Sequence, residues 1–127
     1  MAVSPVPHAF SGESDPLTAD CAGREVFNHL TSRWGLLTML ALIEGPTRFY
    51  RLRDSIGGIS EKMLSQTLKE LTRDGLLTRT VEPTTPPKVT YALSGLGEEI
   101  APTLQSIVEW LGRKIEAIAE HQASFDA

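Results

Sequence analysis

The sequence has little of the chemistry that enzymes and metalloproteins use. Its 127 residues include one cysteine, Cys21, so no disulfide can form within the chain, and a reducing compartment is the simpler expectation. His8, His29 and His121 stand at no metal-ligand spacing from one another, and neither a GxSxG nor a complete GxGxxG motif occurs. We therefore expect no metal site, no cofactor and no enzymatic activity.

Long hydrophobic runs are also absent. The longest nearly apolar segment, residues 34–43, is much shorter than the roughly 20 residues that a membrane-spanning helix needs, and it predicts a buried helix. Residues 1–20 carry three acids and neither Lys nor Arg, so they lack the positive start of a secretory signal. We expect a cytoplasmic protein that makes no contact with a membrane.

The charge is distributed unevenly along the chain. The formal net charge is -4, from 12 Lys and Arg against 16 Asp and Glu. Residues 21–93 nevertheless carry ten bases and seven acids, whereas residues 94–127 carry two bases and six acids. A basic middle between acidic ends can attract a polyanion to one face of the molecule.

The spacing of apolar residues predicts one domain over residues 18–127, preceded by a flexible arm at residues 1–17. A first short helix begins after Asp20, which can cap it. A second helix spans residues 34–44 and ends where Gly45 and Pro46 follow.

Two further helices are joined by a short turn that contains Gly57 and Gly58. Thr47 is the expected cap of the earlier helix, and Ser60 is the expected cap of the later one. The inner face of the later helix carries Leu64, Leu68 and Leu71. Two helices connected in this way predict a helix-turn-helix.

After Gly75 the pattern changes from helical to alternating. Residues 77–82 and 88–93 alternate apolar and polar side chains and predict a β-hairpin, whose connection at residues 83–87 is too rich in proline to join the strands. Ser94 can cap a long final helix, in which Pro102 predicts a kink or a restart. The predicted fold is mainly α with a small β-hairpin.

The helix after Ser60 has a polar face suited to DNA. Lys62, Gln66, Lys69 and Arg73 recur at i, i+4, i+7 and i+11, with Ser60 and Ser65 beside them. Long bases can bind phosphates in a major groove, and glutamine can bond an adenine edge. The alternative is an ordinary solvated face of an amphipathic helix.

The hairpin can approach the same nucleic acid. Arg79 and Lys88, together with the hydroxyls of Thr84 and Thr85, can reach a phosphate backbone or a minor groove beside the helix. The full set of predicted DNA contacts is Arg48, Arg51, Ser60, Lys62, Ser65, Gln66, Lys69, Arg73, Arg79, Thr84, Thr85 and Lys88.

The final helix carries an apolar stripe that is too long for a small domain to cover. A second copy of the chain can cover it, so we expect a homodimer with a two-fold axis. The predicted interface residues are Ile100, Leu104, Ile107, Val108, Trp110, Leu111 and Ile115.

Several segments of the chain, taken together, are similar to one bacterial family. The chain from Cys21 to about Gly112 resembles the HxlR family of winged helix-turn-helix transcription regulators, which are MarR-like. The segments that carry the resemblance include Arg33-Trp34-Gly35-Leu36-Leu37, Glu44-Gly45-Pro46, Arg48-Phe49 with Leu52, Gly58-Ile59-Ser60-Glu61-Lys62-Met63-Leu64-Ser65-Gln66, Leu68-Lys69-Glu70-Leu71, Asp74-Gly75-Leu76, Pro86-Pro87-Lys88-Val89-Thr90-Tyr91-Ala92-Leu93-Ser94 and Leu96-Gly97.

The resemblance implies a dimer that binds an operator near the regulated genes. It implies that the first helix and the last, at about residues 18–32 and 95–122, form the interface, that the fourth helix enters the major groove and that the hairpin is a wing. It also implies that Cys21 senses electrophiles, quinones, aldehydes or oxidants. A thiol at a helix start near Arg24 ionises more readily than a free one, whereas a small buried interface residue is the alternative for this position.

Together these observations predict a sequence-specific DNA-binding regulator, in particular a dimeric repressor that reads a pseudo-palindrome. One alternative is a winged-helix module that binds another protein and no specific DNA. Another is a regulator controlled by a small molecule, with an apolar pocket lined by Phe27, Trp34 and Trp110 and with an inert cysteine.

Overall fold

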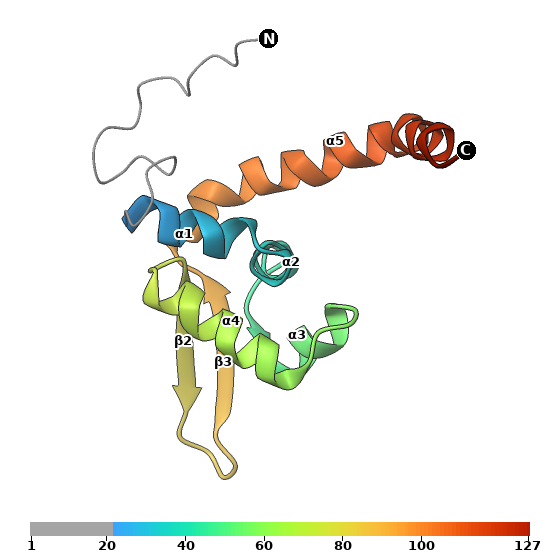
Figure 1. Cartoon of the computed structure of the whole chain (residues 1–127). Coiled ribbons are helices and arrows are strands. Elements are labelled where there is room, and N and C mark those ends of the chain that lie inside the picture. The colour runs from blue at the N-terminus through green and yellow to red at the C-terminus, as the bar shows by residue number, and fades with distance from the viewer. Residues whose placement is uncertain (1–21) are drawn as a thin grey trace.

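A computed structural model describes residues 22–127. Cys21, the cap predicted at Asp20 and the arm predicted at residues 1–17 lie outside the described residues. In chain order, the elements are α1 (Ala22–Thr31), α2 (Arg33–Ala41), β1 (Thr47–Arg48), α3 (Phe49–Ser55), α4 (Glu61–Arg73), β2 (Leu77–Glu82), β3 (Lys88–Leu93) and α5 (Gly95–Asp126). Figure 1 shows α1 and α2 between α5 on one side and α4 with the hairpin on the other.

The core lies where α2, α3, α4 and the start of α5 meet. The leucines predicted for the inner face of α4 are fully buried, which confirms the inner face that the spacing of these leucines predicted. The other members of the core are Met39, Leu42, Leu52, Ile56, Ile59, Leu76, Leu77 and Leu104. Because α4 is anchored along its length, its opposite face is held in a fixed orientation.

The helix-turn-helix starts and ends as its capping residues predict. The Ser60 Oγ accepts a hydrogen bond from the Met63 amide at 3.1 Å, which confirms Ser60 as the cap of α4. Gly75, at φ +81°, ends the helix in the left-handed region that favours glycine. Ser94 caps α5 by accepting from the Gly97 amide at 3.1 Å, and its hydroxyl donates to the Gly75 carbonyl oxygen at 2.6 Å. The end of α4 and the start of α5 are thus joined at the base of the hairpin.

The hairpin has a third strand that the sequence did not predict. The strand order is β1-β3-β2, all antiparallel, and Thr47 and Arg48 pair with Tyr91 and Thr90. The cap predicted at Thr47 is therefore wrong: α3 begins only at Phe49, after Arg48, which is extended and forms no side-chain cap. Two residues are too few for alternation to show, and pairing with β3 determines their conformation.

The second helix is shorter at its end than predicted. It spans Arg33–Ala41 rather than residues 34–44, and Ser32 caps it by accepting from the Gly35 amide at 3.1 Å. A turn follows before Gly45, whose φ of +133° supplies the sharp change of direction.

The last helix runs unbroken through Pro102, so the restart considered for this position is wrong. Pro102 is exposed, and a carbonyl that loses its intrahelical donor there can bond to water instead. With 32 residues, α5 is about 48 Å long. Its buried residues are confined to its first third, and the remainder projects from the body of the molecule (Figure 1).

Candidate nucleic-acid interface

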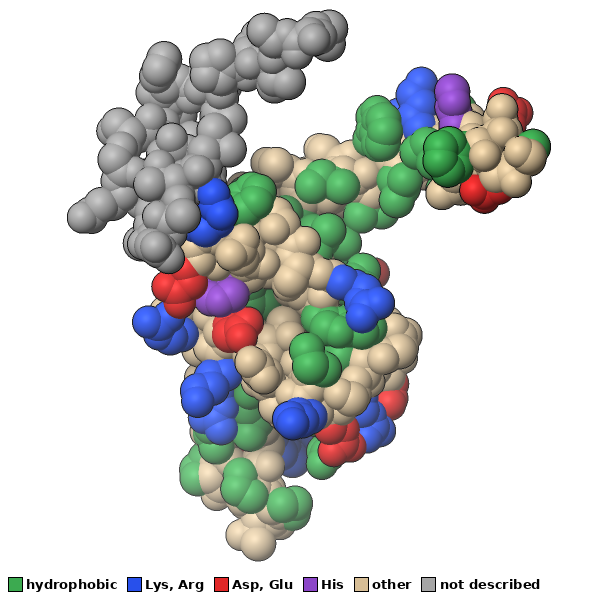
Figure 2. All heavy atoms as spheres, in the orientation of Figure 1, with side chains coloured by type: hydrophobic (Ala, Val, Ile, Leu, Met, Phe, Trp, Pro, Cys, Tyr) green, Lys and Arg blue, Asp and Glu red, His purple; other side chains and the backbone are tan. Residues whose placement is uncertain are grey.

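The outer face of α4 presents the side chains that the sequence predicted for DNA contact. Lys62, Ser65, Gln66, Lys69 and Arg73 are all exposed, opposite the buried leucines. Figure 2 shows several Lys and Arg side chains in the region of α4, with Asp and Glu side chains among them. The face therefore has a mixed character, and the ion pairs decide which bases are available.

Two bases near α4 are held by acids of the chain. Arg73 Nη1 lies 2.8 Å from Glu25 Oε1, so the last turn of α4 is tied to α1. Arg53 bonds to Glu61 and, at 3.2 Å, to Asp54, and these carboxylates raise the pKa of its guanidinium. The Arg53–Glu61 pair joins α3 to the start of α4 across the turn between the two helices.

The central part of the face is less constrained. Within residues 22–127, Lys62 and Lys69 have no hydrogen-bond or ion-pair partner. Gln66 Nε2 donates to Glu70 Oε1 at 3.2 Å, an exposed i,i+4 contact of the kind that contributes only a few tenths of a kcal/mol. The two lysines, with Ser65 and Gln66 between them, are thus open to an external partner.

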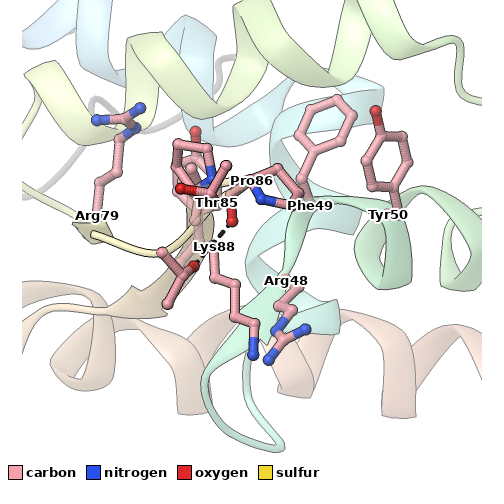
Figure 3. Close-up of a pocket in the computed structure, with 11 residues that line it drawn as sticks. Arg48, Phe49, Tyr50, Arg79, Thr85, Pro86 and Lys88 are labelled. Atoms are coloured by element: carbon pink, nitrogen blue, oxygen red, sulfur yellow. Dashed lines mark hydrogen bonds between the residues drawn. The ribbon is translucent and has the colours of Figure 1, made fainter. Parts of the chain in front are cut away.

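The hairpin adds a second cationic region. Arg48, Arg79 and Lys88 come from three different strands and line one groove of about 640 Å³ between the hairpin and the first turn of α3 (Figure 3). Thr84 and Thr85 lie at its loop end, where the Thr84 hydroxyl donates to the Pro86 carbonyl oxygen at 2.8 Å. The other residues that line the groove are Phe49, Tyr50, Pro86, Pro87, Val89 and Tyr91.

The predicted contact at Arg51 lies beside this region. Arg51 is exposed on α3 and lines a neighbouring depression together with Arg48 and Tyr50. The structure therefore brings the predicted contacts together in two groups, one on α4 and one around the hairpin, and draws Arg73 toward α1.

Sequence reasoning missed the contact of His29, which it considered only as a possible metal ligand. His29 Nδ1 lies 2.5 Å from Asp74 Oδ2, and its Nε2 lies 3.8 Å from Glu70 Oε2. The contact joins α1 to the C-terminal end of α4. No local signal could have revealed it, because the partners are 45 residues apart.

The aromatic side of the groove was missed for a similar reason. Phe49 and Tyr50 stand at the start of α3 and Tyr91 stands on β3, and only the pairing of β1 with β3 brings them together. Phe27, Trp34 and Trp110, which the sequence suggested for an apolar pocket, do not line this groove. Trp34 packs beneath Arg33, whose Cζ lies 4.4 Å from the indole centroid, and Trp110 is half-exposed on the projecting part of α5.

Residues 22–127 show neither a metal-binding cluster nor a membrane-spanning helix. Within residues 22–127, no group of three or more His, Cys, Asp or Glu side chains is arranged to hold a metal ion. No helix in this part of the chain is long and apolar enough to cross a bilayer.

Comparison with known proteins matches the chain to regulators. Residues 29–119 match the family described as HxlR-like helix-turn-helix. The HTH-type transcriptional regulator YtfH of Escherichia coli K12 is 46% identical over 99 residues, which cover 78% of this chain and 79% of that protein. The structure of the transcriptional regulator ytfH from Salmonella typhimurium has a TM-score of 0.80 at 39% identity and covers 84% and 96% of the two chains. The structure of diamide-treated YodB from B. subtilis has a TM-score of 0.62 at 34% identity and covers 76% and 96%.

Proposed function

Because the chain belongs to the HxlR-like helix-turn-helix family, whose named members here are transcriptional regulators rather than enzymes, we propose that it is a repressor that binds a specific DNA operator as a homodimer. The observation that carries this proposal is the outer face of α4, where Lys62 and Lys69 flank two shorter polar side chains. Such a protein acts where the DNA is, in the cytoplasm.

The arrangement of α4 suits a major groove. Lys62 and Lys69 are separated by about 10 Å along the helix axis, a spacing comparable to the groove width of about 12 Å. In this proposal the two ammonium groups bind phosphates, and Ser65 and Gln66 between them meet base edges. Gln66 must release Glu70 to do so, at the small cost of an exposed contact.

The hairpin serves as the wing. Arg79, Lys88 and Arg48 supply positive charge on the three strands, where we expect the phosphate backbone next to the occupied major groove to pass. Thr84 and Thr85 at the loop are placed to add hydroxyl contacts. Arg51 extends this cationic region along α3. Arg73 joins the interface only if it leaves Glu25.

The projecting part of α5 supports the dimer. Ile107, Val108, Trp110, Leu111 and Ile115 are 44–50% exposed in a single chain, which is unusual for a stripe of large apolar side chains. Leu104 belongs to the core of its own chain and Ile100 is partly buried against it, so the surface offered to a partner begins at Ile107. A two-fold dimer would set two α4 helices one DNA turn apart, about 34–36 Å, or a multiple of it.

In this proposal, a chemical signal modifies Cys21 and the change is transmitted through α1 to α4. Cys21 lies immediately before the described part of α1, and α1 is joined to α4 by Glu25–Arg73 and His29–Asp74. YodB, whose structure was determined after treatment with the thiol oxidant diamide, supports a thiol as the sensor. Modification of Cys21 by an oxidant or electrophile would then shift α4 relative to its dimer partner.

The test is fluorescence anisotropy with the upstream intergenic DNA and a scrambled duplex, at several salt concentrations. We expect Lys62→Ala/Lys69→Ala to weaken binding to both duplexes and, with four lysines lost per dimer, to reduce the slope of log affinity against log salt by about 4. The matched control Arg113→Ala/Lys114→Ala removes the same charge from α5. Equal effects of the two variants, or equally weak binding of the unmodified protein to both duplexes, would favour a protein-binding module instead.

A further inference from the structure

We propose that the groove between the wing and the first turn of α3 binds a small planar aromatic anion, a carboxylate on one or two fused rings, and that this ligand competes with DNA. The competition rests on the proposed function. The binding itself rests only on the groove.

The charged side chains that line the groove are all basic. Arg48, Arg79 and Lys88 line it, and no acid is present among the described residues that do so. Within residues 22–127, none of the three bases forms an ion pair. Figure 3 shows the Lys88 side chain extending toward the end of the groove where the Arg48 guanidinium lies. A carboxylate at that end would meet two cations that have no internal partner.

The remaining wall is apolar and aromatic. Phe49 and Tyr50 stand edge to face, with ring centroids 5.3 Å apart and planes at 87°, and Tyr91 faces the same space from β3. Pro86 and Val89 complete this side. A phosphodiester needs cations but gains nothing from rings, whereas a flat aromatic ligand gains from both.

The pairing of the strands keeps the groove open. β1 ends at Arg48, opposite Thr90, so the edge of β3 at Val89 and Lys88 has no strand beside it on that side. The wing loop closes the far end and is held by the bond from the Thr84 hydroxyl to the Pro86 carbonyl. A volume of about 640 Å³ lies within the usual range of sites for small molecules, about 300–1,000 Å³.

Occupation of the groove would oppose DNA binding for two reasons. The ligand neutralises bases that the proposed function assigns to the phosphate backbone. It also fills the space between the wing and α3 that a backbone would approach. The groove would therefore make the regulator responsive to aromatic acids without the participation of Cys21.

The experiment uses isothermal titration of the full chain, without DNA, with 2-naphthoate and its neutral analogue 2-naphthamide. We expect 2-naphthoate to bind one site per chain and the amide to bind at least tenfold more weakly. Tyr50→Leu, which removes one wall, should weaken 2-naphthoate binding about three- to tenfold. Phe125→Leu, which alters a 90% exposed ring at the end of α5, should leave it unchanged. Lys88→Gln should weaken it, whereas Lys114→Gln should not.

Displacement of DNA is measured separately by anisotropy with the unmodified chain. 2-Naphthoate should release the upstream duplex at concentrations where inorganic phosphate of equal ionic strength does not. No binding of 2-naphthoate, equal binding of the amide, or binding insensitive to both Tyr50→Leu and Lys88→Gln would overturn the inference, whatever the DNA result. Groove binding by a chain that binds no DNA would instead refute the proposed function alone.

Discussion

His29 Nδ1 lies 2.5 Å from Asp74 Oδ2, and this contact fastens α1 to the C-terminal end of the proposed recognition helix. Asp74 is nearly buried, with 4% of its side chain exposed, and it stands at the negative end of the helix dipole, where a carboxylate is disfavoured. The imidazole N–H supplies the donor that this carboxylate needs. The contact therefore joins the position of α1 to that of the C-terminal end of α4.

The first prediction concerns this contact. His29→Ala should lower the free energy of unfolding by about 1–3 kcal/mol, because it leaves a buried carboxylate without its donor. Urea denaturation followed by circular dichroism measures the change. His121→Ala, at an exposed position near the end of α5, is the control and should be neutral. A similar stability of the two variants would show that the contact contributes nothing.

The second prediction concerns the first turn of α5. A Cβ at Gly97 would lie 2.3 Å from the Leu76 carbonyl oxygen, whereas a Cβ at Gly95 would meet nothing within 4 Å. Gly97→Ala should therefore destabilise the protein by about 1–3 kcal/mol, since backbone must move to admit the methyl group. Gly95→Ala should be neutral or slightly stabilising. Thermal unfolding of the pair provides the comparison, and equal melting temperatures would contradict the close approach.

The third prediction concerns the dimer. Leu111→Glu should convert the proposed dimer to monomers at micromolar concentration, because it would bury a charge in the proposed interface. Sedimentation velocity measures the mass. Val81→Glu is a matched control, since Val81 is 45% exposed on the wing and Leu111 is 44% exposed on α5. If both variants remained dimeric, the outer part of α5 would not be the interface.

The fourth prediction separates base recognition from phosphate contact. Gln66→Ala should reduce the preference for the operator over scrambled DNA by about 1–3 kcal/mol, because it removes the proposed base-edge contact, while the salt dependence stays the same. Competition binding measures the ratio of the two affinities. Lys69→Ala should do the opposite: it should lower the affinity for both duplexes by the same factor and reduce the salt dependence. A Gln66→Ala variant that loses affinity equally for both would exclude a role in reading bases.

The sequence predicted those parts of the fold that depend on local patterns. Ser60 and Ser94 cap the helices that their positions predict, and the leucine spacing of α4 identified its buried face, because capping and amphipathicity act within a few residues. Thr47 was misassigned because its conformation is decided by Tyr91, far along the chain. The restart at Pro102 was wrong because an exposed carbonyl can bond to water where a buried one cannot.

The candidate site also has a part that local patterns predict and a part that depends on tertiary contacts. The polar face of α4 follows from one helix, and its residues could be named in advance. The grouping of Arg48, Arg79 and Lys88 depends on the pairing of three strands, and the contact of His29 with Asp74 depends on how two helices cross. Neither arrangement leaves a periodic trace in the sequence.

The number of residues between the packed part of α5 and its projecting part determines the direction in which the apolar stripe faces. The helix is packed on the body through Gly97, Ala101 and Leu104, and its projecting surface begins three residues later. Each residue of an α-helix turns the chain by about 100°, so one residue inserted between residues 104 and 107 would rotate the stripe from Ile107 onward by that angle relative to α4. In the proposed dimer, the number of residues in this short segment would therefore set the angle between the two α4 helices, and with it the operators that both helices could bind at once.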